Sequence, residues 1–119
     1  MAKEKTNLMI NKVNDFIDDW VDTVFKDIKV EFTESNVVKT LIYENKWYAW
    51  KLFNDYTIIM IAFNDLDYTF NCEVSFKIPD PIEKEGFYHS AVTEITFDEM
   101  VDFIKECYQN NRKEIEKVC

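Results

Sequence analysis

The hydrophobic pattern is clearest between Tyr68 and Ile78, where apolar and polar residues alternate without a break. The even-numbered positions are all apolar and the odd-numbered positions are all polar: Tyr68, Phe70, Cys72, Val74, Phe76 and Ile78 against Thr69, Asn71, Glu73, Ser75 and Lys77. Successive side chains of a β-strand point to opposite faces of a sheet, so this segment has one apolar face and one polar face. It predicts a long strand with a buried side, ending at Pro79.

Further β-rich segments precede this strand and are separated by short polar turns. The predicted strands are 29–32, 37–43, 47–53 and 56–63, with turns at 34–36, 44–46, 54–55 and 64–67. Short turns between strands are typical of consecutive antiparallel pairs, so the pattern predicts a meander. A loop is expected over 79–90, which holds both prolines and the only glycine. A short sixth strand over 91–95 is left open.

Apolar residues at three- and four-residue steps predict a helix at each end of the chain. The first helix is expected over 7–27, with an apolar stripe made by Met9, Val13, Phe16, Ile17, Trp20, Val21 and Val24. The second is expected over about 97–117, where Thr96 and Glu99 match a capping box. The predicted fold class is α+β: one domain over 1–119, with an N-terminal helix, a five- to six-stranded antiparallel meander sheet and a C-terminal helix, both helices packed on the sheet.

Two of the predicted strands, 47–53 and 56–63, are apolar on both faces. A strand of this kind needs cover on both sides of its sheet. Helices are expected over one face. For the other face three alternatives stay open: the second helix, a curled sheet that wraps a cavity, or another copy of the chain. A homodimer is therefore one expectation.

The chain of 119 residues carries a formal net charge of −9. Such a charge repels phosphate, which argues against direct nucleic-acid binding and against anionic membranes. It favours a basic protein partner, or serves only to keep the protein in solution. The longest apolar run, 56–63, is too short for a bilayer span of about 20 residues. Three widely spaced cysteines without a CxxC motif predict reduced thiols and a cytoplasmic location.

Catalytic and metal-binding patterns are sparse, and we predict a protein that is not an enzyme and holds no cofactor or metal. The single histidine, His89, adjoins Ser90, but neighbouring side chains of an extended chain point apart. One glycine does not provide a phosphate-binding loop. Glu44, Asp65 and Asp67 fall at one end of the predicted meander and would suit a weak cation site or an acid-dependent reaction, although solvated turns explain them more simply.

Four aspartates on the first predicted helix suggest a function. Asp15, Asp18, Asp19 and Asp22 lie within about 10 Å of helix axis, with no lysine between them. Duplex DNA carries one charge per roughly 1.7 Å of its axis, so this stripe is dense enough to compete for a basic, nucleic-acid-binding surface. The leading hypothesis is an antagonist, inhibitor, immunity or chaperone-like protein that presents these carboxylates to a basic protein.

The aromatic residues suggest a different class, a protein that binds a small ligand. Five rings would line a cavity beneath a strongly curved sheet: Trp47, Tyr48, Trp50, Phe63 and Phe70. The simpler interpretation is that these rings fill the core.

Overall fold

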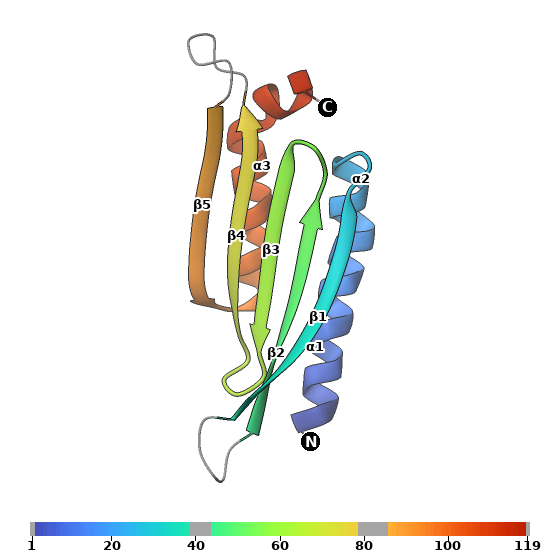
Figure 1. Ribbon diagram of the computed structural model, residues 1–119, viewed down its shortest axis with the longest axis vertical. Helices are drawn as coiled ribbons and strands as arrows, with labels where there is room; N and C mark the ends of the chain where they lie inside the picture. Colours follow the sequence, from blue (N-terminus) through green and yellow to red (C-terminus); the bar gives the residue numbers. More distant parts are fainter. Residues whose placement is uncertain (1, 39–43, 79–85, 119) are drawn as a thin grey trace.

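The computed structural model describes residues 2–38, 44–78 and 86–118. Its elements follow one another as α1 (Ala2–Phe16), a π-helical turn η1 (Ile17–Val21), α2 (Asp22–Val24), β1 (Lys29–Val38), β2 (Glu44–Phe53), β3 (Thr57–Asn64), β4 (Thr69–Ile78), β5 (Gly86–Ile95) and α3 (Phe97–Val118). The predicted α+β class, with a helix at each end of an antiparallel sheet, is confirmed (Figure 1).

The sheet has the strand order β1-β2-β3-β4-β5, with every neighbouring pair antiparallel. This is the meander that the alternating segments predict. In β4 the even-numbered side chains Phe70, Cys72, Val74 and Phe76 are each at most 1% exposed. The odd-numbered side chains of the same strand are exposed or half-buried. The long amphipathic strand predicted from 68–78 is therefore present, and it pairs with both of its neighbours.

The turns predicted at 34–36 and 44–46 are wrong. β1 continues through Ser35, which pairs with Trp47, and β2 has already begun at Glu44. Positions 37 and 38 thus belong to β1, and the rest of the strand predicted over 37–43 lies outside the described residues. Polar residues are tolerated here because β1 is an edge strand, where one row of backbone groups and many side chains face solvent.

The loop predicted over 79–90 is wrong at its C-terminal end. β5 begins at Gly86 and pairs with β4 through Ser75↔His89 and Phe76↔Tyr88. Residues 79–85 lie outside the described residues. The segment 91–95 is the last part of β5, so the described residues form five strands and the open alternative of a separate sixth is not needed.

The first helix begins earlier and ends earlier than predicted, and it contains a π-helical turn. Ile17 and Val21 lie at the two ends of this turn, and both are buried. A π turn inserts one extra residue, which the 3.6-residue pattern does not encode.

The last helix matches its prediction. The Thr96 N–H donates to Glu99 Oε1 at 3.1 Å, and the Glu99 N–H donates to Thr96 Oγ1 at 3.2 Å, which completes the predicted capping box.

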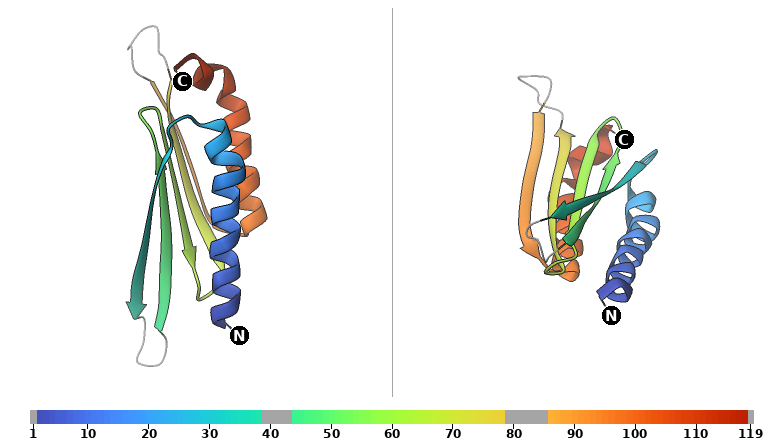
Figure 2. Two further views of the ribbon diagram at one scale, coloured as in Figure 1. Left: turned by 90° about the vertical axis from the view of Figure 1, so that its right-hand side faces the viewer. Right: turned by 60° about the horizontal axis from the view of Figure 1, so that its bottom comes forward.

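Both long helices lie on the same face of the sheet (Figure 2). The core lies between these helices and the sheet. We call α1, η1 and α2 together the first helical segment; its Trp20 ring meets the Tyr108 ring of α3 edge-on, with ring centres 5.6 Å apart. The opposite face is made by the odd-numbered positions of β1, β2, β4 and most of β5, and by the even-numbered positions of β3. We call it the open face, because no element of the described chain covers it.

Candidate functional site

The first helical segment exposes all four aspartates predicted to bind a partner. Asp15 is the last residue but one of α1, Asp18 and Asp19 lie in η1, and Asp22 is the first residue of α2. All four side chains are exposed. The other side of this segment is held by buried apolar residues, among them Val13 at 0%, Ile17 at 4% and Val21 at 0% exposure. Burial of this stripe offsets the poor helix propensity of aspartate and fixes which way the carboxylates face.

The carboxylates of these four aspartates have no basic partner among the described residues. The ion pairs found there join Lys46 to Glu34 and His89 to Glu73. Two lysines on the helices lie over aromatic rings: Lys12 Nζ of α1 is 5.6 Å from the centre of the Phe97 ring, and Lys105 Nζ of α3 is 5.8 Å from the centre of the Trp20 ring. The negative charge of the aspartates is therefore left for solvent or for another molecule. We call Asp15, Asp18, Asp19 and Asp22 the acidic face.

The five aromatic residues predicted to line a cavity are divided between the two faces. Tyr48, Trp50, Phe63 and Phe70 are buried beneath the helices, at 6%, 1%, 0% and 0% exposure, within one hydrophobic core. The Tyr48, Phe63 and Phe70 rings contact one another in sequence, while the Trp50 ring packs against Phe32. Phe63 and Phe70 have ring centres 4.9 Å apart. Trp47 belongs to the open face and is half-buried. The structure thus brings four of the five rings together as packed core, while their role in ligand binding stays a prediction.

A hydrogen bond ties one of these buried rings to a helix, and burial changes the acidity of another. The Trp50 Nε1–H donates to Asn14 Oδ1 at 3.0 Å, which links β2 to α1. The Tyr48 hydroxyl keeps its proton more tightly than usual: burial, and then the negative charges of Asp65 and Glu34, raise its pKa. A neutral phenol is what a packed core position requires.

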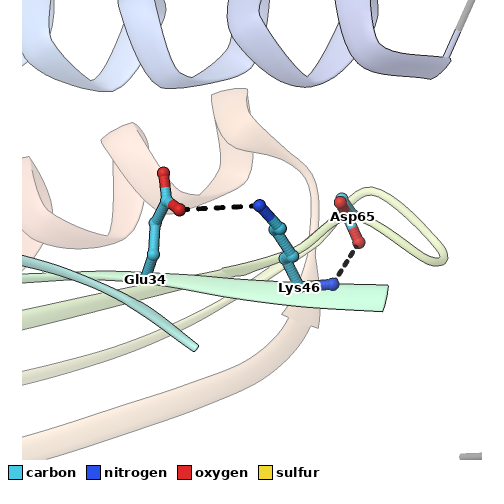
Figure 3. A network of polar contacts seen from close by, with 3 residues as sticks. All are labelled: Glu34, Lys46 and Asp65. Carbon is cyan, nitrogen blue, oxygen red and sulfur yellow. Dashed lines mark hydrogen bonds and ion pairs between the residues drawn. The ribbon is translucent and has the colours of Figure 1, made fainter. Parts of the chain in front are cut away.

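Two of the three carboxylates considered for a cation site, those of Asp65 and Asp67, accept hydrogen bonds from the protein itself. Asp65 Oδ1 accepts the Lys46 N–H at 2.8 Å, while Lys46 Nζ lies 3.6 Å from Glu34 Oε2 (Figure 3). Asp67 Oδ1 accepts both the N–H and the hydroxyl of Thr69, at 3.2 and 2.7 Å. The Glu44 side chain lies outside the described residues. Among the described residues no three histidine, cysteine, aspartate or glutamate side chains are grouped closely enough for a metal ion.

The two described thiols are poorly suited to nucleophilic chemistry. Cys72 and Cys107 are 1% and 3% exposed. Burial, then the neighbouring Cys107 and Glu73, raise the pKa of the Cys72 thiol far above its usual range. Burial also raises the pKa of Cys107, although its sulfur accepts a hydrogen bond from the Tyr88 hydroxyl at 3.5 Å. A thiol held protonated in this way is a weak nucleophile.

The open face carries a hollow of about 440 Å³ that sequence reasoning missed. Its floor is a row of short side chains that pair across the strands: Thr33↔Ala49, Ala49↔Ala62 and Ala62↔Asn71. Longer side chains from the next row, including Lys51, Met60 and Glu73, stand along one side. The signal was the presence of alanine within bulky segments, but the row appears only once the register of the strands is known.

Comparison with known proteins does not add a function to this geometry. No family model matches the chain, no curated protein matches it, and no solved structure matches it. Within the described part of the chain, none of the helices has the length and apolar character needed to cross a bilayer. The molecule is a two-layer α+β protein with an acidic face on its first helical segment and an uncovered sheet face. Its function has to be argued from those two surfaces.

Proposed function

We propose that this protein is a non-enzymatic, cytoplasmic binding module that presents its acidic face to a basic surface of another protein. An antagonist, inhibitor, immunity or chaperone-like role would fit such a surface. The observation that supports the proposal is that the four exposed carboxylates lack a basic partner among the described residues, while the opposite side of their helix is anchored in the core.

Physical reasoning favours a basic protein as the partner. The eight residues from Asp15 to Asp22 place four charges along about 10 Å of helix axis. This is about one charge per 2.6 Å, roughly two-thirds of the linear charge density of duplex DNA, which carries one per roughly 1.7 Å. The electrostatic field of these carboxylates speeds diffusional encounter with a positively charged surface and repels negatively charged competitors. Because the segment is fixed by its buried stripe, little ordering of the backbone is required on binding.

The test is affinity capture from the native host with three proteins: the native chain, an acidic-face variant and a charge-matched control. The acidic-face variant changes Asp15, Asp18, Asp19 and Asp22 to asparagine. The control removes four exposed carboxylates elsewhere, through Glu4→Gln, Asp55→Asn, Asp102→Asn and Glu106→Gln. We expect a basic protein, identified by mass spectrometry, to be retained by the native chain and the control and lost by the acidic-face variant.

Two outcomes of this capture would contradict the proposal. Equal retention of the partner by the acidic-face variant would show that another surface binds it. Equal loss with both variants would show that only the net charge matters. Circular dichroism of each variant establishes that the fold is retained before capture is compared.

A second candidate function is binding of a small apolar ligand, and the hollow of the open face favours it. Its volume, about 440 Å³, falls within the range of ligand pockets, roughly 300–1,000 Å³. Any such ligand would lie on the open face and not among the four buried rings. Fluorescence of anilinonaphthalene sulfonate, with Ala62→Leu as the variant that fills the floor of the hollow, tests this candidate. Unchanged dye binding by Ala62→Leu would remove it.

A further inference from the structure

The open face exposes apolar side chains in the middle of the sheet, far from either edge strand. On β3, Ile58 is 42% and Met60 is 44% exposed, and both belong to the open face. Phe53 on β2 is half-buried beside Ile58, with which it pairs directly. A sheet face of this kind is normally packed against another layer.

The charges on the open face are arranged so that two copies of the chain complement each other. One register row reads Glu31, Lys51, Met60, Glu73 and Ala91 from β1 to β5. Lys51 and Glu73 stand at equal distance on either side of the central strand, separated by Met60. A two-fold axis along β3 would place β2 of each copy opposite β4 of the other. Lys51 of each copy would then face Glu73 of the other copy, which gives two such pairs in the dimer.

We infer that the open face binds a second copy of this chain, face to face, about a two-fold axis that runs along β3. The inference is independent of the acidic face, which lies in the other layer. On the axis Ile58, Met60 and Ala62 each meet their own counterpart, so the centre of the interface is apolar. Beside it, Ala49 faces Asn71 and Phe53 faces Ser75, so these short or polar side chains leave room for the larger ones.

The outer rows raise no barrier to this packing. Glu31 faces Ala91, and Lys29 faces His89, whose Nε2 lies 3.7 Å from Glu73 of its own chain. Lys51 Nζ is 5.1 Å from the Phe53 ring, an exposed contact that leaves the ammonium free to turn toward a carboxylate above it. Packed sheets lie about 10 Å apart, and the flexible Met60 side chains can occupy the hollows beside them.

The area of the open face is near the minimum for a specific interface. Five strands spaced about 4.8 Å apart, over about seven residues of 3.3 Å each, give roughly 550 Å² per copy. Two copies would bury about 1,100 Å², just below the roughly 1,200 Å² at which stable specific interfaces begin and above the roughly 1,000 Å² expected of a biological one. We therefore expect a reversible dimer with a dissociation constant in the micromolar range, not a permanent one.

The decisive test is to reverse charges in the proposed interface and to measure dimerisation of each variant by sedimentation velocity over a concentration series. Lys51→Glu places glutamate opposite Glu73 of the second copy, and Glu73→Lys places lysine opposite Lys51, so each single variant should weaken dimerisation at least about tenfold. The double variant restores opposite charges and should recover most of the dimer. Met60→Lys, which sets two lysines together on the axis, should give monomer only, with its fold checked by circular dichroism.

Other results would overturn the inference. A native mass that stays monomeric at every concentration excludes the dimer. A dimer that all of these variants leave unchanged is formed through another surface. Loss of dye binding by Met60→Lys in a protein that is always monomeric assigns the open face to a small molecule instead. The acidic-face variant should dimerise at least as well as the native chain, so failure of this inference and failure of the proposed function remain distinguishable.

Discussion

At the scale of single residues, Glu94 occupies a backbone conformation that suits glycine better. Its φ is 55°, next to an irregularity in the pairing of β4 and β5, and its N–H donates to Asn71 Oδ1 at 3.0 Å. The left-handed region costs an L-residue roughly 1–2 kcal/mol. Glu94→Gly removes this cost, but glycine also increases the conformational entropy of the unfolded chain, which opposes the gain. The net effect should be a rise of up to about 1 kcal/mol in the free energy of unfolding.

Urea denaturation measures this change, with Glu94→Gln as the control. The glutamine variant removes the same charge without relieving the backbone, so its free energy of unfolding should stay close to that of the native chain. Equal stabilisation by both substitutions would attribute the gain to charge and not to the positive φ.

The Cys72 thiol gives the protein a pH dependence on the alkaline side. Burial is the main cause that raises the pKa of this thiol in the folded state, well above its usual value near 9.0. Above that value the unfolded chain loses the proton while the folded chain keeps it, so the folded state loses stability as pH rises. Each group of this kind contributes a slope of up to about 1.4 kcal/mol per pH unit.

Urea titrations at several pH values between about 8 and 10 test this prediction. The native chain should lose stability faster across this interval than Cys72→Val, which has a side chain of similar size without a titrating proton. Cys107, Tyr48 and Tyr88, whose pKa values are also raised, are present in both proteins, so the comparison isolates Cys72. Parallel pH profiles would show that the thiol ionises equally in the folded and unfolded states.

At the scale of elements, the capping box fixes where α3 begins. The reciprocal hydrogen bonds between Thr96 and Glu99 satisfy two backbone N–H groups that the first turn would otherwise leave unpaired. Thr96→Ala should lower the free energy of unfolding by about 1 kcal/mol. Thr96→Ser keeps the hydroxyl and should recover most of the loss, as measured by chemical denaturation. An equal loss with serine would mean that the threonine methyl group, not the cap, is what stabilises this turn.

The elements that could be predicted are those whose own residues decide their structure. β4 alternates without interruption and α3 carries its own start signal, so both follow from local pattern. The local pattern divides β1 into two strands, because Glu34, Ser35 and Asn36 resemble a turn. Pairing with β2, a contact between segments distant in sequence, overrides that local preference. The π turn at 17–21 likewise does not follow from the 3.6-residue pattern, although its two end residues, Ile17 and Val21, are buried in the core.

At the scale of the whole molecule, the two candidate surfaces differ in how much the sequence reveals. The acidic face could be predicted because its aspartates are close in sequence and one helix holds them. The open face could not be located, because nothing local states that both helices choose the same side of the sheet. Trp47 and Tyr48 are adjacent and similar, yet one lies on the open face and the other in the core. Only the register across β1 to β5 reveals the row of short side chains and the placement of Lys51 and Glu73 on either side of Met60.

The acidic face should also reduce the stability of the native chain, as expected for a surface retained for binding. Like charges three and four residues apart on a helix repel by a few tenths of a kcal/mol per pair, and four such pairs occur among Asp15, Asp18, Asp19 and Asp22. Changing all four to asparagine should raise the melting temperature at low salt by about 3 °C. The gain should shrink as salt is added, because a Debye length of about 10 Å at 0.1 M screens these neighbours.

Differential scanning calorimetry at low and high salt measures the effect, with the charge-matched control changed at Glu4, Asp55, Asp102 and Glu106. In the control only one pair of removed charges, Asp102 and Glu106, is four residues apart on a helix, against four such close pairs in the acidic-face variant. Its gain should therefore be smaller and should depend less on salt. A lower melting temperature for the acidic-face variant would mean that the aspartates stabilise the fold, and their exposure would no longer point to a partner. A higher one means that the four carboxylates do not stabilise the folded chain, as the proposed binding role of the acidic face requires.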